Sequence, residues 1–374
     1  MDKVLSFAAS MGMTVPTWQQ CVMFLVGATL IWLAIKKQYE PMLLLPIGFG
    51  AILANIPNSA IIGEDGFLTR MYEIGIQTEI FPILIFIAIG AMVDFTPIFK
   101  NPFMIFFGAA AQMGIFLTII MAIVLGFDVS EACGIGIIGS ADGPTSIFVA
   151  NRLAPNLLSS ITVAAYSYMA LVPIIQPPII KLLTTKKERT IKMEYADKPV
   201  PNYILILFPI IVTVVSGLLA PMSLSLVGPL MFGNLIRVCG VLEKLSNAAQ
   251  NELSNLVTLF LGITIGSTMQ AEAFLKLQTI EVLLMGLAAF MFGTAAGVIF
   301  GKIVNLFTKE KINPMIGAAG VSAFPMSARV VQKIAHEEDP SNFILMQAVS
   351  ANVSGQLGSA IAGGLLITLV SMFI

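Results

Sequence analysis

The stretch "IIGSADGPTSIFVAN", residues 137–151, carries one acid, two glycines and a proline inside an otherwise apolar chain. Glycine and proline both weaken a helix, glycine through its conformational freedom and proline through its missing N–H donor. At membrane depth such irregular backbone is tolerated only where it is buried in protein or lines a cavity. The stretch therefore predicts a helix that breaks within a folded bundle, with Asp142 at the break.

The composition is that of an integral membrane protein. Of the 374 residues, 57% are hydrophobic and 11% are charged, and the mean hydropathy is +0.91. These values exclude an ordinary soluble domain. Apolar runs of about 20 residues, the length that spans a bilayer, recur from Cys21 to the C-terminus. The sequence thus predicts an all-α polytopic membrane protein, and its net charge of −1 argues against nucleic acid as a partner.

Other chemical motifs are absent. Cys21, Cys133 and Cys239 are isolated within apolar runs, which predicts buried thiols and no metal site. His336 is the only histidine and has no neighbour with which to form a catalytic triad. No phosphate loop or dinucleotide fingerprint occurs, so ATP or NAD chemistry within this chain is not expected. The N-terminus lacks a cleavage signature, and we expect no cleaved signal peptide.

The apolar runs form two sets on either side of a polar loop. The candidate membrane elements before the loop cover residues 21–35, 41–57, 80–96, 103–127, 132–152 and 160–182. Those after the loop cover residues 203–220, 222–241, 255–271, 280–307, 312–334 and 342–373. We expect a first membrane repeat over residues 1–183, a cytoplasmic linker over 184–201 and a second repeat over 202–374.

The two sets resemble each other, in order and at nearly one offset. The matched stretches, at offsets of 183, 176 and 178 residues, are "PIGFGAILAN" and "PLMFGNLIRV" from Pro46 and Pro229, "IGAMVDFTPIFK" and "IGSTMQAEAFLK" from Ile89 and Ile265, and "IGSADGPTSIFVANR" and "IGAAGVSAFPMSAR" from Ile138 and Ile316. Any one match alone could arise by chance among small and apolar residues. Together they indicate an internal duplication.

Loop charges predict how each half crosses the membrane. Lys36, Lys37 and Lys100 mark alternate loops and the linker is rich in lysine and arginine, so the positive-inside rule places all of these in the cytoplasm. That assignment works only if one of the two elements 132–152 and 160–182 does not cross, and the glycines and proline of residues 132–152 make this element the candidate for a segment that turns back. Each half then has about five transmembrane helices and one re-entrant broken hairpin, and an odd number of crossings makes the duplication an inverted repeat. The C-terminus is then extracytoplasmic.

Asp142 is the first candidate for an ion site. A carboxylate at the bilayer centre costs about 2.5–3.5 kcal/mol on insertion scales, so it needs a partner or a function there. Ser140, Thr145 and Ser146 offer hydroxyls beside it, and the Gly-Pro pair frees backbone carbonyls. Hard oxygen ligands of this kind suit an alkali cation and not zinc or copper. Asp142 could then hold Na⁺ or H⁺; the alternative is a protonated structural acid.

The second broken segment has its own polar set. Its polar residues are Asn313, Ser322, Ser327 and Arg329, and its helix breakers are Gly317, Gly320 and Pro325. Asn313 precedes a proline and could simply start a helix. Arg329 cannot lose its charge. It is either an anion site for a substrate carboxylate or an arginine whose charge reaches back to the membrane surface.

Asn352 and Tyr168 fall roughly at matched places in the last helix of each half. They lie in "SANVSGQLGS" and "AAYSYMAL". A buried amide and a buried phenol both suit a polar ion pathway, and each could instead make an interhelical hydrogen bond.

Three motifs together resemble one family. "GSADGPTSIFVAN", "NPMIGAAGVSAFPMSARV" and "ANVSGQLGSAIAGG" are similar to the beta subunit of the sodium-pumping biotin-dependent decarboxylases, which act on oxaloacetate, methylmalonyl-CoA, glutaconyl-CoA or malonate. The similarity runs over essentially the whole chain. The resemblance implies a subunit of the bacterial inner membrane that decarboxylates carboxybiotin and exports Na⁺.

The resemblance also implies roles for individual residues. The metal-binding positions would be Asp142, Asn313, Gly317, Ser322 and Asn352. The catalytic positions would be Arg329, Tyr168 and Ser322. Of these, Arg329 would bind the carboxylate of carboxybiotin.

The implied partners are those of a multisubunit pump. They are a biotin carrier subunit that presents carboxybiotin, a soluble carboxyltransferase alpha subunit and a small single-span membrane subunit, in a homo-oligomeric assembly. The short chain favours the CoA-ester type of the family.

A secondary transporter is the competing interpretation. Inverted repeats with paired hairpins also suit Na⁺-coupled carboxylate symporters and Na⁺/H⁺ antiporters. A transporter works alone, whereas a pump subunit needs a biotinylated partner and should be blocked by avidin.

Overall fold

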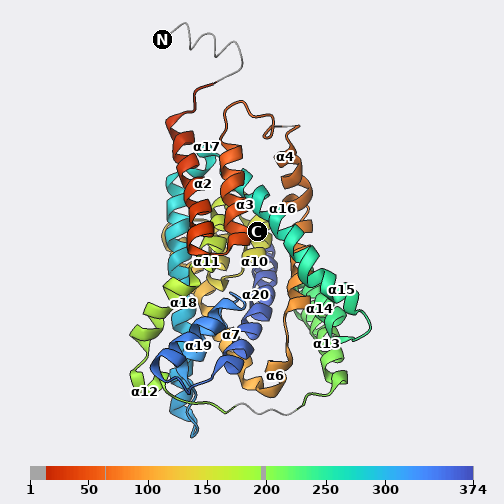
Figure 1. The fold of residues 1–374 in the computed structure, drawn as a ribbon, viewed down its shortest axis with the longest axis vertical. Coiled ribbons are helices and arrows are strands. Elements are labelled where there is room, and N and C mark those ends of the chain that lie inside the picture. The colour runs from red at the N-terminus through yellow and green to blue at the C-terminus, as the bar shows by residue number, and fades with distance from the viewer. Residues whose placement is uncertain (1–13, 64, 195–198, 374) are drawn as a thin grey trace. The chain divides into compact units, whose positions relative to one another are not determined.

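The computed structural model describes residues 14–63, 65–194 and 199–373. Over these residues every regular element is a helix (Figure 1), which confirms the all-α prediction. The N-terminal residues that bear on a signal peptide lie outside the described part. The chain divides into two compact units: unit 1 comprises residues 1–81 and 255–280, and unit 2 comprises residues 82–254 and 281–374. Each unit contains helices from both predicted repeats.

Unit 1 begins with a helix that is capped at both ends. α2 (Trp18–Lys37) starts after Thr17, whose hydroxyl accepts from Gln20 N at 3.2 Å while the Gln20 side chain accepts from Thr17 N at 2.9 Å. This capping box satisfies two backbone donors that the helix start leaves open. Lys36 and Lys37 in the last turn complement the negative end of the helix dipole. The other helices of unit 1 are α3 (Pro41–Ala54), α4 (Phe67–Tyr72), the π-helical turn η1 (Glu73–Gln77), α16 (Ser254–Ser267) and α17 (Ala271–Phe274).

Unit 2 contains the remaining helices. Those from the first half are α5 (Ile80–Met92), α6 (Thr96–Lys100), η2 (Pro102–Met104), α7 (Ile105–Ala111), α8 (Met113–Val124), α9 (Val129–Gly136), η3 (Ile137–Ser140), α10 (Gly143–Leu153), η4 (Pro155–Leu157), α11 (Leu158–Leu183) and α12 (Lys186–Arg189). Those from the second half are α13 (Asn202–Leu219), η5 (Pro221–Ser223), α14 (Leu224–Val238), α15 (Glu243–Ala248), the π-helical turn η6 (Ala249–Leu253), α18 (Leu277–Phe307), η7 (Pro314–Gly320), α19 (Met326–Glu338) and α20 (Leu345–Phe373).

Several of these helices are long and apolar enough to span a bilayer. Among the described residues six pass that test, or seven if residues 67–77 and 80–92 form one broken span. They cover residues 18–37, 102–124, 155–183, 202–219, 277–307 and 345–372. A polytopic membrane protein is therefore supported. The predicted ten crossings remain a prediction, because helices such as α3 and α14 are shorter than the length of about 20 residues that spans the hydrocarbon core.

The prediction of buried thiols is wrong for one cysteine. Cys133 is buried and Cys239 is half-buried, but Cys21 is exposed on α2. α2 buries little of its surface within the protein. An apolar residue on a membrane helix can face lipid, so an apolar sequence context does not require burial in protein.

Two π-helical turns lie at equivalent places in the two halves. η1 directly follows α4, and η6 directly follows α15, so that the turns start 176 residues apart. π-helices are rare and occur mostly as single turns. Their separation equals one of the three offsets between the matched sequence stretches.

In unit 2, α5 and α14 cross at glycines. A Cβ added to Gly90 would lie 1.9 Å from Leu230 O, and one added to Gly233 would lie 2.0 Å from Ile87 O. Because neither position has a side chain, the two backbones come into direct contact, as small residues allow between membrane helices.

Unit 1 has the same kind of contact between α3 and α16. A Cβ on Gly266 would lie 2.2 Å from Ile47 O, and one on Gly50 would lie 2.3 Å from Ile263 O. The offsets of 183 and 176 residues relate α3 to α14 and α5 to α16. The two helix pairs therefore correspond residue by residue, with first-half and second-half helices exchanged. This exchange explains why the compact units cut across the predicted repeats.

Gly90→Ala should destabilise the protein, because the added methyl group would overlap Leu230 O and push α5 and α14 apart. Overpacking of this kind costs at least about 1–3 kcal/mol, measurable as a lower midpoint of thermal unfolding of the purified protein in detergent. Gly228→Ala on α14 is the matched control, since no atom lies within 4 Å of the added Cβ, and its effect should stay within about 1 kcal/mol. Equal midpoints for the two variants would contradict the crossing.

Candidate functional site

The helix break predicted around Asp142 is present. After η3, Ala141 takes a left-handed conformation with φ of 55°, and α10 begins at Gly143. Pro144 lies in the first turn of α10, where its missing N–H is not needed. Asp142 is the N-cap of α10 and accepts a hydrogen bond from Thr145 N at 3.2 Å. The acid thus lies at the interruption and starts the second helix.

Asp142 is buried, with 3% of its surface exposed, and is held by neutral donors. Its Oδ2 accepts from Gln356 Nε2 at 2.9 Å and from Ser359 Oγ at 2.6 Å. Both donors belong to α20 and are neighbours on one face of that helix. Because these donors carry no charge, the ionised carboxylate still requires a cation, or a proton, for charge balance.

The three hydroxyl groups predicted beside Asp142 differ in their hydrogen-bond partners. Ser140 Oγ donates to Ile137 O and Ser146 Oγ donates to Asp142 O, both at 2.7 Å. Thr145 Oγ1 is buried beside the Asp142 carboxyl and bonds to no other group within the described residues. Thr145 therefore offers a hydroxyl oxygen that no backbone group uses.

The second broken segment meets the first. η7 ends in extended backbone at Val321, and Ser322 N donates to Ser140 O at 2.9 Å. Ser322 Oγ donates to Gly355 O of α20 at 2.8 Å. The two breaks, far apart in the sequence, are thus hydrogen-bonded to one another, and the second is also bonded to α20.

Asn352 supports the second break from α20. Its Nδ2 donates to Ala319 O at 3.1 Å and to Val321 O at 2.7 Å, carbonyls near the end of η7 that lack a helical partner. Asn352, Gln356 and Ser359 are spaced i, i+4, i+7 and so share one face of α20. This face contacts both breaks.

Sequence analysis missed Gln356 and Ser359, although both lie in the quoted motif "ANVSGQLGSAIAGG". The spacing of Asn352, Gln356 and Ser359 was the available signal, because three polar residues on one face of a small-residue helix indicate a polar contact.

Known proteins are similar in sequence to this chain over nearly its whole length. The family described as the Na⁺-transporting oxaloacetate decarboxylase beta subunit matches residues 19–370. The chain belongs to this family. Two relatives are each 51% identical over 95% of this chain and 94% of their own: the glutaconyl-CoA decarboxylase subunit beta of Acidaminococcus fermentans and the methylmalonyl-CoA decarboxylase subunit beta of Veillonella parvula. The oxaloacetate decarboxylase beta chain of Klebsiella pneumoniae is 43% identical over 94% of this chain and 95% of its own.

Family membership confirms the resemblance inferred from the three motifs. The chain is a beta-type membrane subunit of a Na⁺-transporting decarboxylase.

In this beta subunit Asn313 and Gly317 make structural contacts on η7. Asn313 Oδ1 accepts from Met315 N at 3.1 Å and caps η7, while its Nδ2 donates to two carbonyls of the linker, each at 3.0 Å. A Cβ on Gly317 would lie 1.8 Å from Gly297 O of α18. Within the described residues neither is hydrogen-bonded to Asp142. The geometry of Asn313 is that of a helix start, the simpler of its two interpretations.

Arg329 lies on α19 with its side chain exposed, one turn before the exposed Lys333. Within the part of the chain that the structure describes, the Arg329 side chain forms no ion pair. Arg329 is therefore not joined to the Asp142 cluster, and its guanidinium is open to a ligand from outside.

Two tyrosines of α11 make different contacts. The Tyr168 hydroxyl donates to Leu283 O of α18. This is the interhelical hydrogen bond that the sequence offered as the alternative to a place in an ion pathway. Tyr166, which the sequence analysis did not select, is buried with its ring against Gly143. Residues two apart on a helix point about 200° apart, so only one of the two can face the break, and the sequence does not indicate which.

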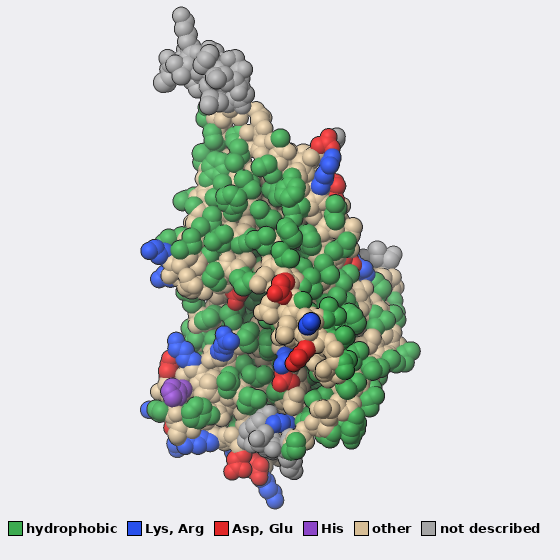
Figure 2. Space-filling view, turned by 45° about the vertical axis from the view of Figure 1, so that its right-hand side comes forward, with side chains coloured by type: hydrophobic (Ala, Val, Ile, Leu, Met, Phe, Trp, Pro, Cys, Tyr) green, Lys and Arg blue, Asp and Glu red, His purple; other side chains and the backbone are tan. Residues whose placement is uncertain are grey.

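The predicted cytoplasmic linker packs on one end of unit 2. Arg189 Nε of α12 pairs with Glu338 at 2.7 Å, a half-buried ion pair, and Lys192 pairs with Asp339 at 3.3 Å. Hydrogen bonds from Ser341, with help from Lys192, lower the pKa of the Asp339 carboxyl below its usual range. Figure 2 shows charged side chains of both signs over much of the lower half of the visible face, with others higher up.

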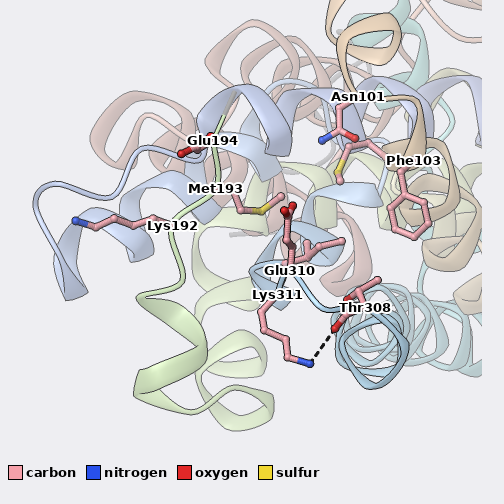
Figure 3. Close-up of a pocket in the computed structure, with 10 residues that line it drawn as sticks. Asn101, Phe103, Lys192, Met193, Glu194, Thr308, Glu310 and Lys311 are labelled. Carbon is pink, nitrogen blue, oxygen red and sulfur yellow. Dashed lines mark hydrogen bonds between the residues drawn. The ribbon is translucent and has the colours of Figure 1, made fainter. Parts of the chain in front are cut away.

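A pocket of about 660 Å³ lies at this end of unit 2. Figure 3 shows it with Asn101 and Phe103 on one side and Lys192, Met193 and Glu194 of the linker on the other. The segment that leads into η7, from Thr308 to Ile312, completes the lining. The pocket is thus lined by both apolar and charged side chains at the end of the unit that carries the linker.

Ser359→Ala should destabilise the subunit more than Ser354→Ala on the same helix. Ser359 donates to a buried carboxylate, and a hydrogen bond to a charged group contributes about 1.5–3 kcal/mol. Ser354 Oγ donates at 2.7 Å to the backbone carbonyl of Ser350, a neutral bond that contributes about 0.5–1.5 kcal/mol. Unfolding free energies measured in detergent with Na⁺ present, so that a cation and not a proton balances the Asp142 charge, give the comparison. Equal losses would mean that the Asp142 contact is no stronger than a neutral one.

Proposed function

We propose that this chain is the membrane subunit of a primary Na⁺ pump, which decarboxylates carboxybiotin on a partner biotin carrier and couples this reaction to Na⁺ export and proton uptake. The observation that carries the proposal is the buried Asp142 carboxylate, held by neutral donors at the contact between two helix breaks, in a chain of the Na⁺-transporting decarboxylase family.

The chemistry of the Asp142 cluster suits Na⁺. The carboxylate and the hydroxyls of Ser359 and Thr145 are hard oxygen ligands, and Gln356 orients the carboxylate through its amide nitrogen. A transported ion must also leave again, and neutral oxygen ligands bind an alkali cation without trapping it. Asp142 would exchange Na⁺ for H⁺, so that each passage through the cycle leaves the site neutral.

Decarboxylation of carboxybiotin provides the driving force and also consumes a proton. Decarboxylation breaks the bond between the ureido nitrogen and the carboxyl carbon, releases CO₂, and leaves the electron pair on nitrogen, which takes up a proton. Export of one Na⁺ against about 100 mV costs about 2.3 kcal/mol before any concentration gradient. Proton uptake and Na⁺ release at one carboxylate would link the two processes.

The inverted repeat is part of the proposal. Residues 1–183 and 202–374 would each form about five transmembrane helices and one re-entrant broken hairpin, inserted from opposite sides. Three observations support it: the equally spaced π-helical turns, the exchanged glycine crossings, and the hydrogen bond between the two breaks. The two hairpins would then meet near the midplane, where transporters of this design bind ions.

The orientation follows from the charged end of unit 2. Linker residues, the C-terminal end of α19 and Lys302 of α18 are joined by ion pairs, and the positive-inside rule places such a lysine-rich end in the cytoplasm. We therefore propose a bacterial inner-membrane protein with an extracytoplasmic C-terminus.

Roles for the remaining predicted residues follow the same scheme. Arg329, exposed on α19, would bind the carboxylate of carboxybiotin. Ser322 and Asn352 would act at the second break, and Tyr168 would act in the ion and proton path. Asn313 and Gly317 would contribute to metal binding through η7, whose conformation they fix.

The partners are proposed from the family. They are a biotin carrier, a soluble carboxyltransferase alpha subunit and a small single-span subunit, in an assembly with several copies of this chain. The higher identity to the glutaconyl-CoA and methylmalonyl-CoA decarboxylase subunits than to the oxaloacetate decarboxylase chain favours a CoA-ester substrate for the whole pump.

Reconstituted with carboxylated biotin carrier, the wild-type chain should release CO₂ only when Na⁺ is present, and Asp142→Asn should lower this release at least about hundredfold, the factor that corresponds to 2.8 kcal/mol. Asp128→Asn is the matched control, because Asp128 caps α9 as Asp142 caps α10 and asparagine caps a helix equally well. Sodium-independent release would overturn the pump. Na⁺ transport by the chain alone, insensitive to avidin, would favour a secondary transporter.

Arg329→Gln should raise the carrier concentration needed for half-maximal CO₂ release about tenfold or more, because a charge-assisted pair with the substrate carboxylate would be lost. Lys333→Gln removes a like charge one helical turn away on the same exposed face and should leave this concentration unchanged. If both variants shift it equally, Arg329 contributes only general positive charge.

A further inference from the structure

Tyr166 is buried on α11 with 1% of its surface exposed, and its hydroxyl has no hydrogen-bond partner within the described residues. Its ring lies against Gly143: an added Cβ there would be 2.4 Å from both Cε1 and Cζ of the ring. Cζ carries the hydroxyl. The phenolic oxygen therefore lies close to the first turn of α10, which Asp142 caps.

A buried hydroxyl without a partner is unfavourable, and each such group in a native protein calls for an explanation. Thr145 Oγ1, on the same turn of α10, is buried beside the Asp142 carboxyl and bonds to no other group within the described residues. Two hydroxyl oxygens that bond to no backbone group thus lie near one carboxylate, at a place where the chain omits a side chain at Gly143. This is the oxygen-rich environment that a desolvated alkali cation requires.

We propose that the neutral Tyr166 hydroxyl is an oxygen ligand of the Na⁺ held by Asp142, together with Thr145 Oγ1. The inference rests on the proposed function, because it requires that Asp142 binds the transported cation. Gly143 has a specific part in it, since any side chain at that position would occupy the space of the phenol.

Tyr168 provides a natural contrast two residues away. Its hydroxyl is bonded to Leu283 O, and its ring lies near Gly286 of α18. Removal of the Tyr168 hydroxyl therefore breaks an existing bond, whereas removal of the Tyr166 hydroxyl breaks none within the described residues.

The experiment uses the full purified chain in detergent, with Na⁺ itself as the probe in NaCl and KCl mixtures of constant ionic strength. A ligand that binds the folded state raises the midpoint of thermal unfolding. The dependence of the midpoint on Na⁺ concentration thus gives an apparent Kd without any catalytic turnover.

Tyr166→Phe keeps the ring and removes one oxygen. We expect its apparent Kd for Na⁺ to rise about tenfold, the factor that 1.4 kcal/mol produces, with a midpoint in the absence of Na⁺ that is unchanged or higher. Thr145→Val should weaken Na⁺ binding in the same direction.

Tyr168→Phe should lower the midpoint at every Na⁺ concentration, because it breaks the bond to Leu283 O. The control is Thr184→Val at the other end of α11, which removes a buried hydroxyl that donates to Ile180 O at 2.6 Å; it should lower the midpoint and leave the apparent Kd unchanged.

The outcomes separate this inference from the proposed function. If the wild-type midpoint responds to Na⁺ but Tyr166→Phe has the wild-type Kd, Tyr166 is not a ligand and the Asp142 site stands. If Tyr166→Phe lowers the midpoint without Na⁺ and leaves the Kd unchanged, the hydroxyl is structural and the inference is overturned. If the wild-type midpoint does not respond to Na⁺ at all, the proposed cation site fails, and this inference fails with it.

Discussion

A carboxylate inside a membrane bundle must be stabilised by groups from several parts of the chain, and this constraint organises the centre of unit 2. The same constraint applies to backbone groups at a helix break, because lipid offers no donors or acceptors. Here one set of contacts meets both needs. Asp142 accepts from the first turn of α10, Ser140 O accepts from Ser322 N, and α20 donates to the acid and to carbonyls of η7. The break places the acid, and the acid in turn caps the helix that the break creates.

Close backbone contact is the second requirement of this arrangement, and glycine provides it. A Cβ on Gly114 would lie 2.6 Å from Gly293 N, and one on Gly139 would lie 2.9 Å from the backbone of Gly114. α8, η3 and α18 therefore meet with no side chain between them. A Cβ on Gly320 would likewise lie 2.3 Å from Phe107 O. Small residues at these positions let two broken segments lie beside continuous helices without an apolar void.

Much of this arrangement could be predicted from local sequence. The breaks at Asp142 and in residues 312–334 follow from glycine and proline, whose backbone effects do not depend on distant contacts. The long apolar helices follow from composition. The short helices α4 and α15, with the π-helical turns that follow them, were not predicted, because their polar residues interrupt any apolar pattern.

The partners of Asp142 could not be predicted in the same way. Whether Tyr166 or Tyr168 faces the break depends on the rotation of α11 about its axis, which neighbouring helices determine. Asn313 is a second example, because its contacts were not evident from the motif: it caps its own helix and bonds to the linker. Residue type and spacing identify candidates, and packing decides which of them face the site.

The shared helix α20 bears on how decarboxylation could be coupled to ion movement. Asn352 and the bond from Ser322 to Gly355 connect α20 to the segment that continues into α19 and Arg329, while Gln356 and Ser359 connect it to Asp142. If Asp142 holds the ion as proposed, and holds it more tightly in one arrangement of the second break, a substrate that favours that arrangement raises the ion affinity; by linkage the ion changes substrate affinity by the same factor. Coupling free energies of this kind are typically about 1–3 kcal/mol, and one Na⁺ moved against 100 mV requires about 2.3 kcal/mol. The upper end of the typical coupling free energy exceeds the cost of moving one Na⁺ by only a small margin, so a flexible connection between the two sites would lose the coupling. Direct hydrogen bonds from one helix face to both breaks provide the stiff connection that such a margin demands.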